Sequence, residues 1–435
     1  MPKAVMVIGA GPAGLYAAKK LANAGHDVAL LNRDLRPGGL AEYGIFFNKY
    51  RMKAGLRKQY VKILNLESIQ YFGGVTVGED APIRLAELCE LGFDAVVVAV
   101  GAQGIKWIDV DGSHAIGVHD AKSLVYHYNG LPPFAQLDIP LGDELAIIGA
   151  GNVAVDIAHW AIHRKIPKVT FYVRRGPMQR KYTDKELAHI GGHVDRAALR
   201  AEVDRIADVL KAVGEDPDAV YANLTKKLGD DRIEGSDSVV NFRFACQPKR
   251  VLRDDQMHIR GMLLDVNELF IKGERVGCCP TGETENVSAD MMVFAVGDKV
   301  DEDFGLATNQ WGEYAVSASP DGQNSYEASD APEGEPVGGV FVVGWARKAS
   351  DGLVGKARKD AEIGVERVFE YLEGRDVASE PGSAMQRLRT LLESRTEFID
   401  WIAFQKIRAV EDGIAEERGL DDFRFESDDE MRGCL

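Results

Sequence analysis

The chain has few cysteines, and none of them lies in a spacing that carries redox or cluster chemistry. The five are Cys89, Cys246, Cys278, Cys279 and Cys434. They form no C-x-x-C pair, and no four of them have the spacing of iron–sulfur ligands. The sequence therefore predicts no cluster, no other metal site and no reactive dithiol of the kind that disulfide reductases use. The adjacent Cys278-Cys279 pair is expected to be structural or incidental.

Long hydrophobic runs and an excess of positive charge are also lacking. Apolar runs such as Ala95–Val100 are far too short to span a bilayer. The net charge of −16 argues against non-specific binding of nucleic acid. Because Ala4–Ile8 already has the pattern of a buried strand, no signal peptide is expected before it, and a cytoplasmic location is predicted. A chain of 435 residues with 45% hydrophobic and 28% charged residues is expected to form two or three globular domains.

What the chain does contain is one glycine signature twice, about 140 residues apart. The first copy is Val7-Ile8-Gly9-Ala10-Gly11-Pro12-Ala13-Gly14-Leu15, and the second is Ile147-Ile148-Gly149-Ala150-Gly151-Asn152-Val153-Ala154-Val155. One such signature predicts one bound dinucleotide. Two predict a pair of dinucleotides that face each other, which is typical of a flavin that exchanges electrons with a nicotinamide.

The first copy lies between a predicted strand, Ala4–Ile8, and a predicted helix, Ala13–Ala24. Gly9 permits the tight turn, Gly11 lets a pyrophosphate approach the backbone, and Gly14 lets the helix and the strand pack closely. The pyrophosphate would then lie against the free N–H groups at the start of the helix.

An acid normally follows the second strand of such a unit and binds the adenosine ribose hydroxyls. Here the predicted strand Val28–Leu31 is followed by Asn32. Its amide can still bond a hydroxyl, although without the assistance of a charge. Asp34 is the alternative for this contact.

The second copy has Ala154 in place of the third glycine, as the fingerprint permits. The next predicted strand, Val169–Val173, ends in Arg174 and Arg175, where an NAD site would place an acid. Guanidinium groups offer planar forks to a 2′-phosphate, so the hypothesis is a site for NADP(H). A solvated arginine pair at a strand end is the alternative, and NAD(H) is also possible.

Motifs of one known family recur along nearly the whole chain, with residues 190–335 the least similar. They are Val7–Leu15, Gly39-Leu40, Tyr43-Gly44-Ile45, Gly149–Ala158, Arg174-Arg175-Gly176-Pro177, Lys185-Glu186-Leu187, Gly344-Trp345, Gly352-Leu353-Val354 and Trp401–Arg432. On these motifs the chain resembles adrenodoxin reductase and the related NADPH–ferredoxin reductases, which belong with the small subunit of glutamate synthase.

The resemblance implies an α/β fold with two Rossmann-like dinucleotide-binding domains, in which the NADP domain is inserted into a discontinuous FAD domain. Residues 1–105 and 336–435 would form the FAD-binding domain, and residues 106–335 the NADP-binding domain. The sequence agrees with this division, because residues 317–338 are predicted to be a loop and Val340–Val343 a returning buried strand. The stretch Gly352–Arg367 is predicted to be a helix.

The resemblance also implies roles for individual residues. The helix that begins near Gly352 would point its N–H groups at the flavin, which Leu353 and Val354 would contact through their backbone. Trp345 would lie near the nicotinamide, and Glu186 would border the 2′-phosphate pocket. The predicted catalytic residues are Asp156 and Trp345. The predicted cofactor-binding residues are Gly9, Gly11, Pro12, Ala13, Gly14, Asn32, Gly39, Leu40, Gly101, Gly149, Gly151, Asn152, Val153, Arg174, Arg175, Glu186, Gly344, Trp345, Gly352, Leu353 and Val354.

Three segments depart from the family pattern. Relatives carry a Pro-and-His segment close to the flavin, where this chain has Phe46–Tyr50. The histidine that partners Asp156 in the family is absent. The family usually has Gly after the basic residue of its Gly-Trp motif, whereas this chain has Ala349 after Arg347-Lys348.

The function that the resemblance implies is FAD-dependent electron transfer between NADP(H) and a ferredoxin-type iron–sulfur protein, by hydride transfer to or from flavin N5. An alternative is a FAD- and NAD(P)-binding subunit of a larger complex, glutamate synthase-like or an oxoacid–ferredoxin oxidoreductase, with an iron–sulfur partner subunit. A third possibility is a FAD-bound interaction module without catalysis.

Because the chain is acidic overall, an acidic carrier could dock only on a local basic patch. The candidate patch lies near the predicted flavin, and a solvated helix face is its alternative interpretation. It consists of Lys49, Arg51, Lys53, Arg57, Lys58 and Lys62.

Overall fold

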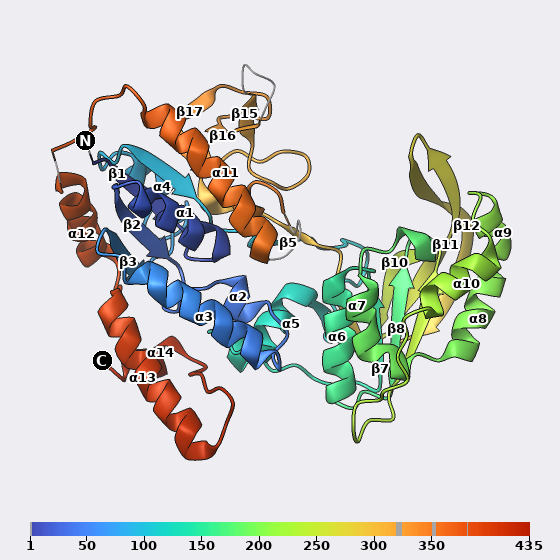
Figure 1. Ribbon diagram of the computed structural model, residues 1–435. Helices are drawn as coiled ribbons and strands as arrows, with labels where there is room; N and C mark the ends of the chain where they lie inside the picture. Colours follow the sequence, from blue (N-terminus) through green and yellow to red (C-terminus); the bar gives the residue numbers. More distant parts are fainter. Residues whose placement is uncertain (1, 319–323, 350–353, 381) are drawn as a thin grey trace. The chain divides into compact units, whose positions relative to one another are not determined.

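The computed structural model describes residues 2–318, 324–349, 354–380 and 382–435, and it divides into two compact units (Figure 1). The first unit consists of Met1–Ile105, Tyr126–Gln136 and Asp298–Leu435. The second unit consists of Lys106–Val125 and Leu137–Gly297.

The first unit is built on a seven-stranded sheet in the order β15-β16-β17-β4-β1-β2-β3. The strands from β17 to β3 are parallel, and β15 and β16 add an antiparallel edge. Since β2 and β4 flank β1 on opposite sides, the strand order reverses at β1. The strands are β1 (Ala4–Ile8), β2 (Asp27–Asn32), β3 (Ile69–Gly73), β4 (Ala95–Val98), β15 (Val316–Ala318), β16 (Asn324–Ser329) and β17 (Pro336–Val342). A further short pair, β5 (Gly104–Ile105) and β14 (Asp298–Lys299), joins the points where the chain leaves this unit and returns to it.

Helices cover both faces of this sheet, so its parallel strands are apolar on both sides. Val5 and Val7 of β1 pack in one core together with residues of α1, α3 and α11, which lie on one face (Figure 1). Met6 and Ile8 pack in a second core with residues of α4 and α12 on the other face. The helices of the unit are α1 (Pro12–Asn23), α2 (Leu40–Tyr43), α3 (Tyr50–Leu64), α4 (Leu85–Cys89), α11 (Val354–Leu372), α12 (Ser383–Arg395), α13 (Trp401–Arg418) and α14 (Asp428–Arg432), with the 3₁₀ helices η1 (Phe134–Gln136), η4 (Glu302–Phe304) and η5 (Gly344–Ala346).

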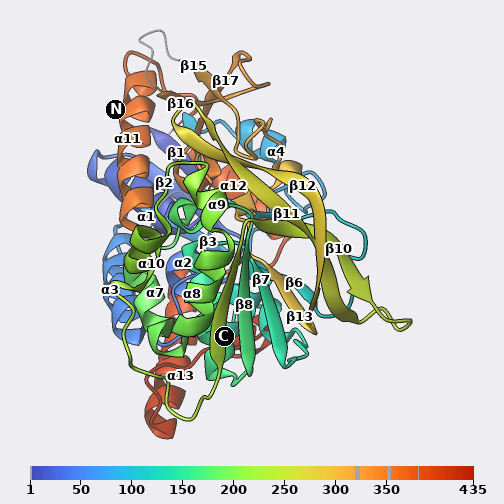
Figure 2. The same ribbon diagram turned by 90° about the vertical axis from the view of Figure 1, so that its right-hand side faces the viewer.

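The second unit contains a five-stranded parallel sheet in the order β6-β13-β7-β8-β9 (Figure 2). Strand order reverses at β7 as it does at β1 in the first unit. An antiparallel sheet, β10-β11-β12, packs on one face, where Met262 and Leu264 share a core with Ile148 and Phe294. The strands are β6 (Val118–Asp120), β7 (Glu144–Ile148), β8 (Lys168–Val173), β9 (Val239–Phe244), β10 (Cys246–Arg253), β11 (Ile259–Lys272), β12 (Arg275–Ser288) and β13 (Met291–Phe294).

The helices of the second unit follow the pattern of a doubly wound fold, with α6 connecting the parallel strands β7 and β8. One helix, α5 (Ala121–Tyr128), begins in the second unit and ends in the first. The others are α6 (Asn152–His163), α7 (Asp184–Leu187), α8 (Arg196–Arg205), α9 (Ala207–Lys211) and α10 (Pro217–Thr225), with the 3₁₀ helices η2 (Pro177–Gln179) and η3 (Ala188–His193).

The predicted loop over residues 317–338 is wrong for the part of that segment that the structure describes. The end of β15, all of β16 and the start of β17 lie within it, and β16 pairs with β17. Phe304 and Tyr314 are buried in the core of the first unit. The chain therefore returns to the first unit at Asp298, earlier than the expected residue 336, and residues 126–136 also belong to that unit.

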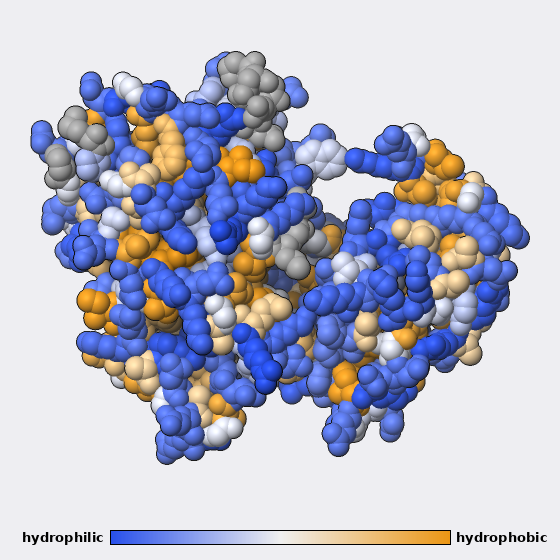
Figure 3. Space-filling view, in the orientation of Figure 1, coloured by the Kyte–Doolittle hydropathy of each residue, from blue (hydrophilic) through white to orange (hydrophobic). Residues whose placement is uncertain are grey.

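The face of the molecule drawn in Figure 3 is mainly hydrophilic. Hydrophilic side chains cover most of the face shown in Figure 3, and hydrophobic side chains occur there in separate small areas. Within the described ranges, no helix combines the length and the apolar character needed to cross a bilayer.

Candidate functional site

Both glycine signatures form the tight turn that follows the first strand of a parallel sheet. The first glycine turn, Gly9–Gly14, joins β1 to α1, and the second glycine turn, Gly149–Ala154, joins β7 to α6. Each lies where the strand order reverses, which is where open α/β sheets bind ligands. Gly9 and Gly149 have φ angles of +105° and +138°, a conformation that only glycine adopts readily.

A neighbouring strand end lies so close to each turn that a side chain has no room. A Cβ atom at Gly9 would lie 2.6 Å from the carbonyl oxygen of Ala99. At Gly149 it would overlap the carbonyl oxygen of Ala295, and at Gly14 it would overlap the carbonyl oxygen of Gly9. Packing within the protein therefore accounts for glycine at these three positions.

Gly11 and Gly151 are different, because a Cβ atom on either would meet no atom of the described residues within 4 Å apart from its chain neighbours. Their φ angles of −76° and −100° are open to any residue. Neither folding nor packing thus requires glycine here. The missing side chains leave space above the backbone, and this space suits a pyrophosphate that approaches the N–H groups.

The two helices that start at these open positions have unsatisfied N–H groups. In the described residues, no side chain caps the start of α1 or of α6, and neither helix has an acidic residue in its first turn. The positive end of each helix dipole is therefore not neutralised by the protein. Each turn can hold one anionic phosphate group, so the residues present fit two dinucleotides.

A second loop supports each glycine turn in the same way. In the first unit the carbonyl oxygen of Ala10 accepts a hydrogen bond from Gly38 N–H at 2.8 Å. In the second unit the carbonyl oxygen of Ala150 accepts bonds from the N–H groups of Lys181 and Tyr182 at 2.7 and 3.0 Å. The backbone of each turn is therefore fixed before any ligand binds.

The predicted ribose residue Asn32 is buried, and its amide is already bonded within the protein. Its Oδ1 accepts a hydrogen bond from Ala10 N–H at 2.9 Å. Its Nδ2 donates to the carbonyl oxygens of Asp34 and Arg36 at 2.8 and 3.1 Å. The geometry thus places Asn32 at the first glycine turn, but as a support of the backbone.

Gly39 and Leu40 lie beside the first glycine turn, as their prediction as cofactor-binding residues requires. Gly39 has a φ angle of +50°, and a Cβ atom there would lie 3.0 Å from Gly11 Cα. Leu40 follows as the first residue of α2. Pro12 is the first residue of α1 and the buried Ala13 is the second, which puts both at the positive end of that helix.

A buried network of charges ties this loop to the C-terminal helices, and the sequence did not reveal it. Arg36, 3% exposed in its side chain, donates to the fully buried Glu411 of α13 at 2.5 Å. Arg57 of α3 bonds both Glu42 and Asp422, at 2.7 and 2.8 Å. These pairs join residues up to 375 positions apart, so no local pattern could have indicated them. Neighbouring arginines hold the pKa of Asp422 far below its ordinary value in spite of burial.

The Gly344-Trp345 motif also lies at the first glycine turn. Gly344 has a φ angle of +68°, and a Cβ atom there would lie 2.6 Å from Ala13 Cβ. Its N–H donates to Asp360 of α11 at 2.6 Å, and the same carboxylate is paired with Arg347. Trp345 follows in η5 and is half-buried.

Four further predicted residues of the first unit belong to the flavin site that the resemblance implies. Gly101 follows β4 with a φ angle of +73°. Val354 is the first residue of α11. The predicted contacts of Gly352 and Leu353 lie outside the described residues.

In the second unit, Arg174 and Arg175 stand at the end of β8 with fixed backbones and free side chains. Asn267 Nδ2 donates to the Arg174 carbonyl oxygen at 2.9 Å, and Ala245 N–H donates to that of Arg175 at 3.1 Å. In the described part of the chain, neither guanidinium group makes a hydrogen bond or an ion pair. In a protein with 68 acidic residues, such a pair is available for an external anion.

The other predicted residues of the second unit surround the start of α6. Asn152 is its first residue, and its Oδ1 accepts a bond from Thr183 N–H at 2.9 Å. Val153 is 43% exposed. Asp156 lies one turn further along α6, and Glu186 lies in α7 with Nε2 of His189 3.8 Å from its Oε2.

The candidate basic patch is smaller than the sequence indicated. Lys53 is only 2% exposed and donates to Asn129 Oδ1 at 2.6 Å, while Arg57 is paired with carboxylates as described above. Burial lowers the pKa of Lys53 to about 7. The exposed cations of α3 are Arg51, Lys58 and Lys62, and their spacing puts them on one face of the helix.

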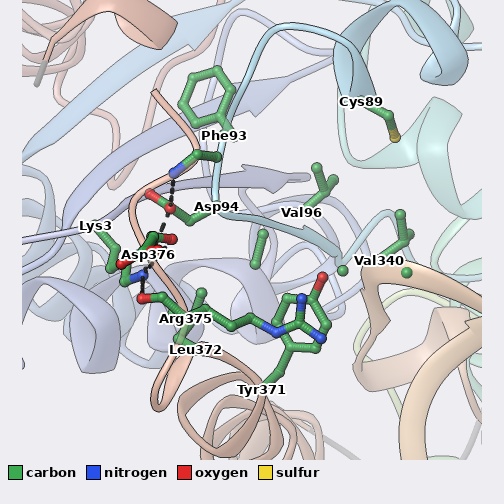
Figure 4. Close-up of a pocket in the computed structure, with 14 residues that line it drawn as sticks. Lys3, Cys89, Phe93, Asp94, Val96, Val340, Tyr371, Leu372, Arg375 and Asp376 are labelled. Carbon is green, nitrogen blue, oxygen red and sulfur yellow. Dashed lines mark hydrogen bonds and ion pairs between the residues drawn. The ribbon is translucent and has the colours of Figure 1, made fainter. Parts of the chain in front are cut away.

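A cavity of about 340 Å³ in the first unit lies at the amino ends of the parallel strands, whereas the glycine turn follows the carboxyl end of β1 (Figure 4). It is at the amino ends of β1 and β4 and at the end of α11, where carbonyl groups face outward. Lys3 Nζ donates to the carbonyl oxygens of Arg375 and Asp376 at 2.5 and 2.9 Å, and it lies 3.9 Å from Asp94 Oδ1. Its lining combines the cations Lys3 and Arg375 with the carboxylates Asp94 and Asp376, and neither glycine turn contributes to it.

Residues with metal-binding or thiol chemistry do not gather into a site in the described ranges. No group of His, Cys, Asp and Glu there could hold a metal ion. The five cysteines are free thiols, and Cys278 and Cys279 lie in β12 of the antiparallel sheet.

Known proteins resemble this chain over nearly its full length. The family model described as pyridine nucleotide-disulphide oxidoreductase matches residues 3–321. The mitochondrial NADPH:adrenodoxin oxidoreductase of Arabidopsis thaliana is 27% identical over 96% of this chain and 92% of its own length. The NADPH-ferredoxin reductase FprA of Mycobacterium tuberculosis is 28% identical over 96% of both chains.

A solved structure of the same mycobacterial protein, FprA in complex with NADPH, superposes with a TM-score of 0.83. The two chains are 26% identical in this alignment, which covers 99% of each. The two parallel sheets and their order along the chain are thus those of a known α/β fold.

Proposed function

Because the chain belongs to the pyridine nucleotide-disulphide oxidoreductase family, we propose that it is a FAD-dependent oxidoreductase that passes electrons between NADP(H) and a ferredoxin-type carrier. The observation that carries the proposal is the pair of glycine turns with open positions at Gly11 and Gly151. FAD supplies the chemistry, since a flavin takes up two electrons as a hydride and releases them one at a time. The protein contributes binding, orientation and exclusion of water.

The first unit is the proposed FAD site. Gly11, Pro12 and Ala13 would bind the pyrophosphate at the start of α1, with Gly39 and Leu40 closing the turn. The dipole of α11, which the structure describes from Val354 onward, would favour a negative charge on the flavin. In the same account Gly101 and Gly344 let the backbone approach the cofactor closely, and Trp345 borders the nicotinamide.

The second unit is the proposed NADP(H) site. Gly151, Asn152 and Val153 would bind the pyrophosphate at the start of α6. The two free guanidinium groups of Arg174 and Arg175 support a contact with the 2′-phosphate, and Glu186 would border that contact. Asp156 is proposed as a catalytic residue because it lies on α6, one helical turn after Asn152. NADH is the competing donor.

The electron acceptor proposed is an acidic iron–sulfur protein of the ferredoxin type. The Arabidopsis thaliana relative is named for adrenodoxin and the Mycobacterium tuberculosis relative for ferredoxin, which supports this class of carrier. On this chain, α3 offers five Lys or Arg side chains and no acidic residue in 15 positions. The proposed docking surface is its exposed stripe of Arg51, Lys58 and Lys62. A role as the flavin subunit of a larger complex is the second candidate, and a cytoplasmic location stays a prediction.

The proposal is tested by anaerobic turnover of the purified, FAD-loaded protein with NADPH and a bacterial-type ferredoxin. We expect NADPH oxidation to be coupled to ferredoxin reduction with two ferredoxins reduced for each NADPH. A protein that oxidises NADPH with a small dye but reduces no ferredoxin under any condition would overturn the assignment of the carrier. Gel filtration from the native source distinguishes the free enzyme from a subunit of a complex.

A further inference from the structure

The side chain of Asn32 holds together the two loops that would surround the FAD pyrophosphate. It lies at the end of β2 and is only 6% exposed. Its oxygen accepts from Ala10 N–H, and its amide nitrogen donates to the carbonyl oxygens of Asp34 and Arg36, with a longer contact of 3.4 Å to the Tyr71 hydroxyl. A primary amide has two N–H donors, so its donor capacity is used up within the protein.

Ala10 is held from both sides by these loops. Asn32 binds its N–H group at 2.9 Å, and Gly38 N–H binds its carbonyl oxygen at 2.8 Å. The next residue is Gly11, the open position at the start of α1. The orientation of the N–H groups around the open space therefore depends on the bonds to Asn32.

We propose that Asn32 is a positioning residue for FAD, which fixes the backbone of Gly9–Gly11 for the pyrophosphate and does not bind the adenosine ribose. The inference rests on the proposed function, because it requires FAD to occupy the first glycine turn. It assigns to this position a different task from that of the acid in the dinucleotide fingerprint.

The chemistry of the contacts explains why an amide stands here instead of an acid. A carboxylate could accept the bond from Ala10 N–H equally well. It has no hydrogen to give to the carbonyl oxygens of Asp34 and Arg36, and its charge would repel both. Asn32→Asp introduces the acid that the fingerprint has at this position. It should nevertheless loosen the first glycine turn, because the hydrogen bonds to the two carbonyl oxygens are lost.

The first test is the FAD affinity of apoprotein carrying Asn32→Asp or Asn32→Leu, measured by quenching of flavin fluorescence. At pH 8 we expect both variants to bind FAD roughly tenfold more weakly or worse, the effect of leaving buried polar groups unpaired. The loss in Asn32→Asp should shrink as the pH is lowered to about 5.5, because a protonated acid regains one donor. The loss in Asn32→Leu should not change with pH.

This pH profile separates positioning from simple damage to the fold. Recovery of binding at low pH in the same sample shows that the loss at pH 8 is not misfolding. Binding of 2′,5′-ADP to the second unit provides a further check, since that unit is untouched in both variants. If Asn32→Asp binds FAD as tightly as the parent protein at pH 8, or more tightly, the inference is overturned.

The second test uses a FAD analogue whose adenosine lacks the 2′- and 3′-hydroxyls. If Asn32 does not contact the ribose, the analogue loses the same factor of affinity in the parent protein and in Asn32→Leu. If the analogue loses affinity in the parent protein but not in Asn32→Leu, the side chain is a ribose ligand and the inference fails. A parent protein that binds no FAD at all would instead end the proposed function.

Discussion

At the scale of single residues, two glycines report directly on ligand binding. Gly11 and Gly151 have backbone angles that alanine adopts freely, and within the described part of the chain a Cβ atom there would have no contact beyond its chain neighbours. Any effect of adding a methyl group must therefore come from what occupies the open space. This makes the two positions cleaner probes than Gly9 or Gly14, where a methyl group would also disrupt the fold.

We predict that Gly11→Ala and Gly151→Ala affect different nucleotides. Gly11→Ala should lower FAD affinity by roughly tenfold or more, about 1.4 kcal/mol, with unchanged affinity for 2′,5′-ADP. Gly151→Ala should do the reverse. Flavin content and calorimetric titration of each variant measure this. A matched control is Gly413→Ala in α13, where a Cβ atom also meets no protein atom and neither ligand should be affected. Equal losses of both ligands in one variant would contradict the assignment.

The free guanidinium groups at the end of β8 lead to a prediction about donor choice. Replacing Arg174 and Arg175 together by Ala should raise the KM for NADPH by about tenfold or more, since charge-assisted bonds to a phosphate are lost. The KM for NADH should change by less than about threefold. Steady-state rates with each donor measure both values. Arg275→Ala serves as a control, because Arg275 is an exposed arginine in β12. A similar loss for both donors would rule out the 2′-phosphate contact.

Lys53 leads to a prediction about pH and stability. Its pKa is lowered to about 7 in the folded protein, mainly by burial and then by the charge of Arg424. The unfolded chain has the ordinary lysine pKa near 10.4, so between about pH 7 and pH 10 the unfolded state binds more protons and stability rises with pH. Below pH 7 the full cost of the buried charge is present. Lys53→Met should therefore raise the melting temperature more at pH 6 than at pH 9. A gain that grows with pH would contradict the lowered pKa.

At the scale of elements, α3 serves two purposes on its two faces. One face places Lys53 and Arg57 into the buried charge network, and the other exposes Arg51, Lys58 and Lys62. The sequence revealed the five cations but not this division, because their partners Asn129 and Asp422 are distant in the chain. The exposed stripe is what an acidic carrier could contact.

Charge reversal on that stripe tests it as a docking surface. Arg51→Glu, Lys58→Glu and Lys62→Glu together should slow ferredoxin reduction by about tenfold or more at low ionic strength and spare reduction of ferricyanide. The effect should fade as salt is added. The control is the same number of reversals at exposed lysines on other elements, Lys226, Lys272 and Lys406. If ferredoxin reduction and ferricyanide reduction slow equally, the stripe is not the docking surface. The same conclusion follows if the control reversals slow ferredoxin reduction as much as the reversals on the stripe.

The sequence predicted those elements whose signal lies within one short segment of the chain. The glycine turns, with β1, α1, β7 and α6 around them, follow from hydrophobic runs and glycine spacing within short segments. The strands β15 and β16 did not follow, since they are short, and they are stabilised by pairing with β17 and by cores built from distant residues. The partners of Asn32 were also hidden, because they are backbone groups whose positions only the folded loops define.

At the scale of the whole molecule, the two units repeat one arrangement of strand, glycine turn and helix, and different residues hold the turn in each unit. In each, a glycine turn at the reversal of strand order is bonded at its central alanine by a second loop. The sequence correctly indicated the doubled signature and the α/β class. In the structure the chain returns to the first unit at Asp298, earlier than expected. The sequence also did not reveal the pair of Arg36 with Glu411 of α13 or the pair of Arg57 of α3 with Asp422.

The central claim is that one chain binds FAD and NADP(H) so that a hydride passes between them. The visible spectrum of the purified protein during anaerobic titration with NADPH tests this claim most directly. We expect a flavin spectrum that is bleached by about one equivalent of NADPH, and much less readily by NADH. A colourless protein that takes up no FAD on reconstitution would contradict it. So would a FAD-loaded protein whose spectrum stays unchanged in excess NADPH.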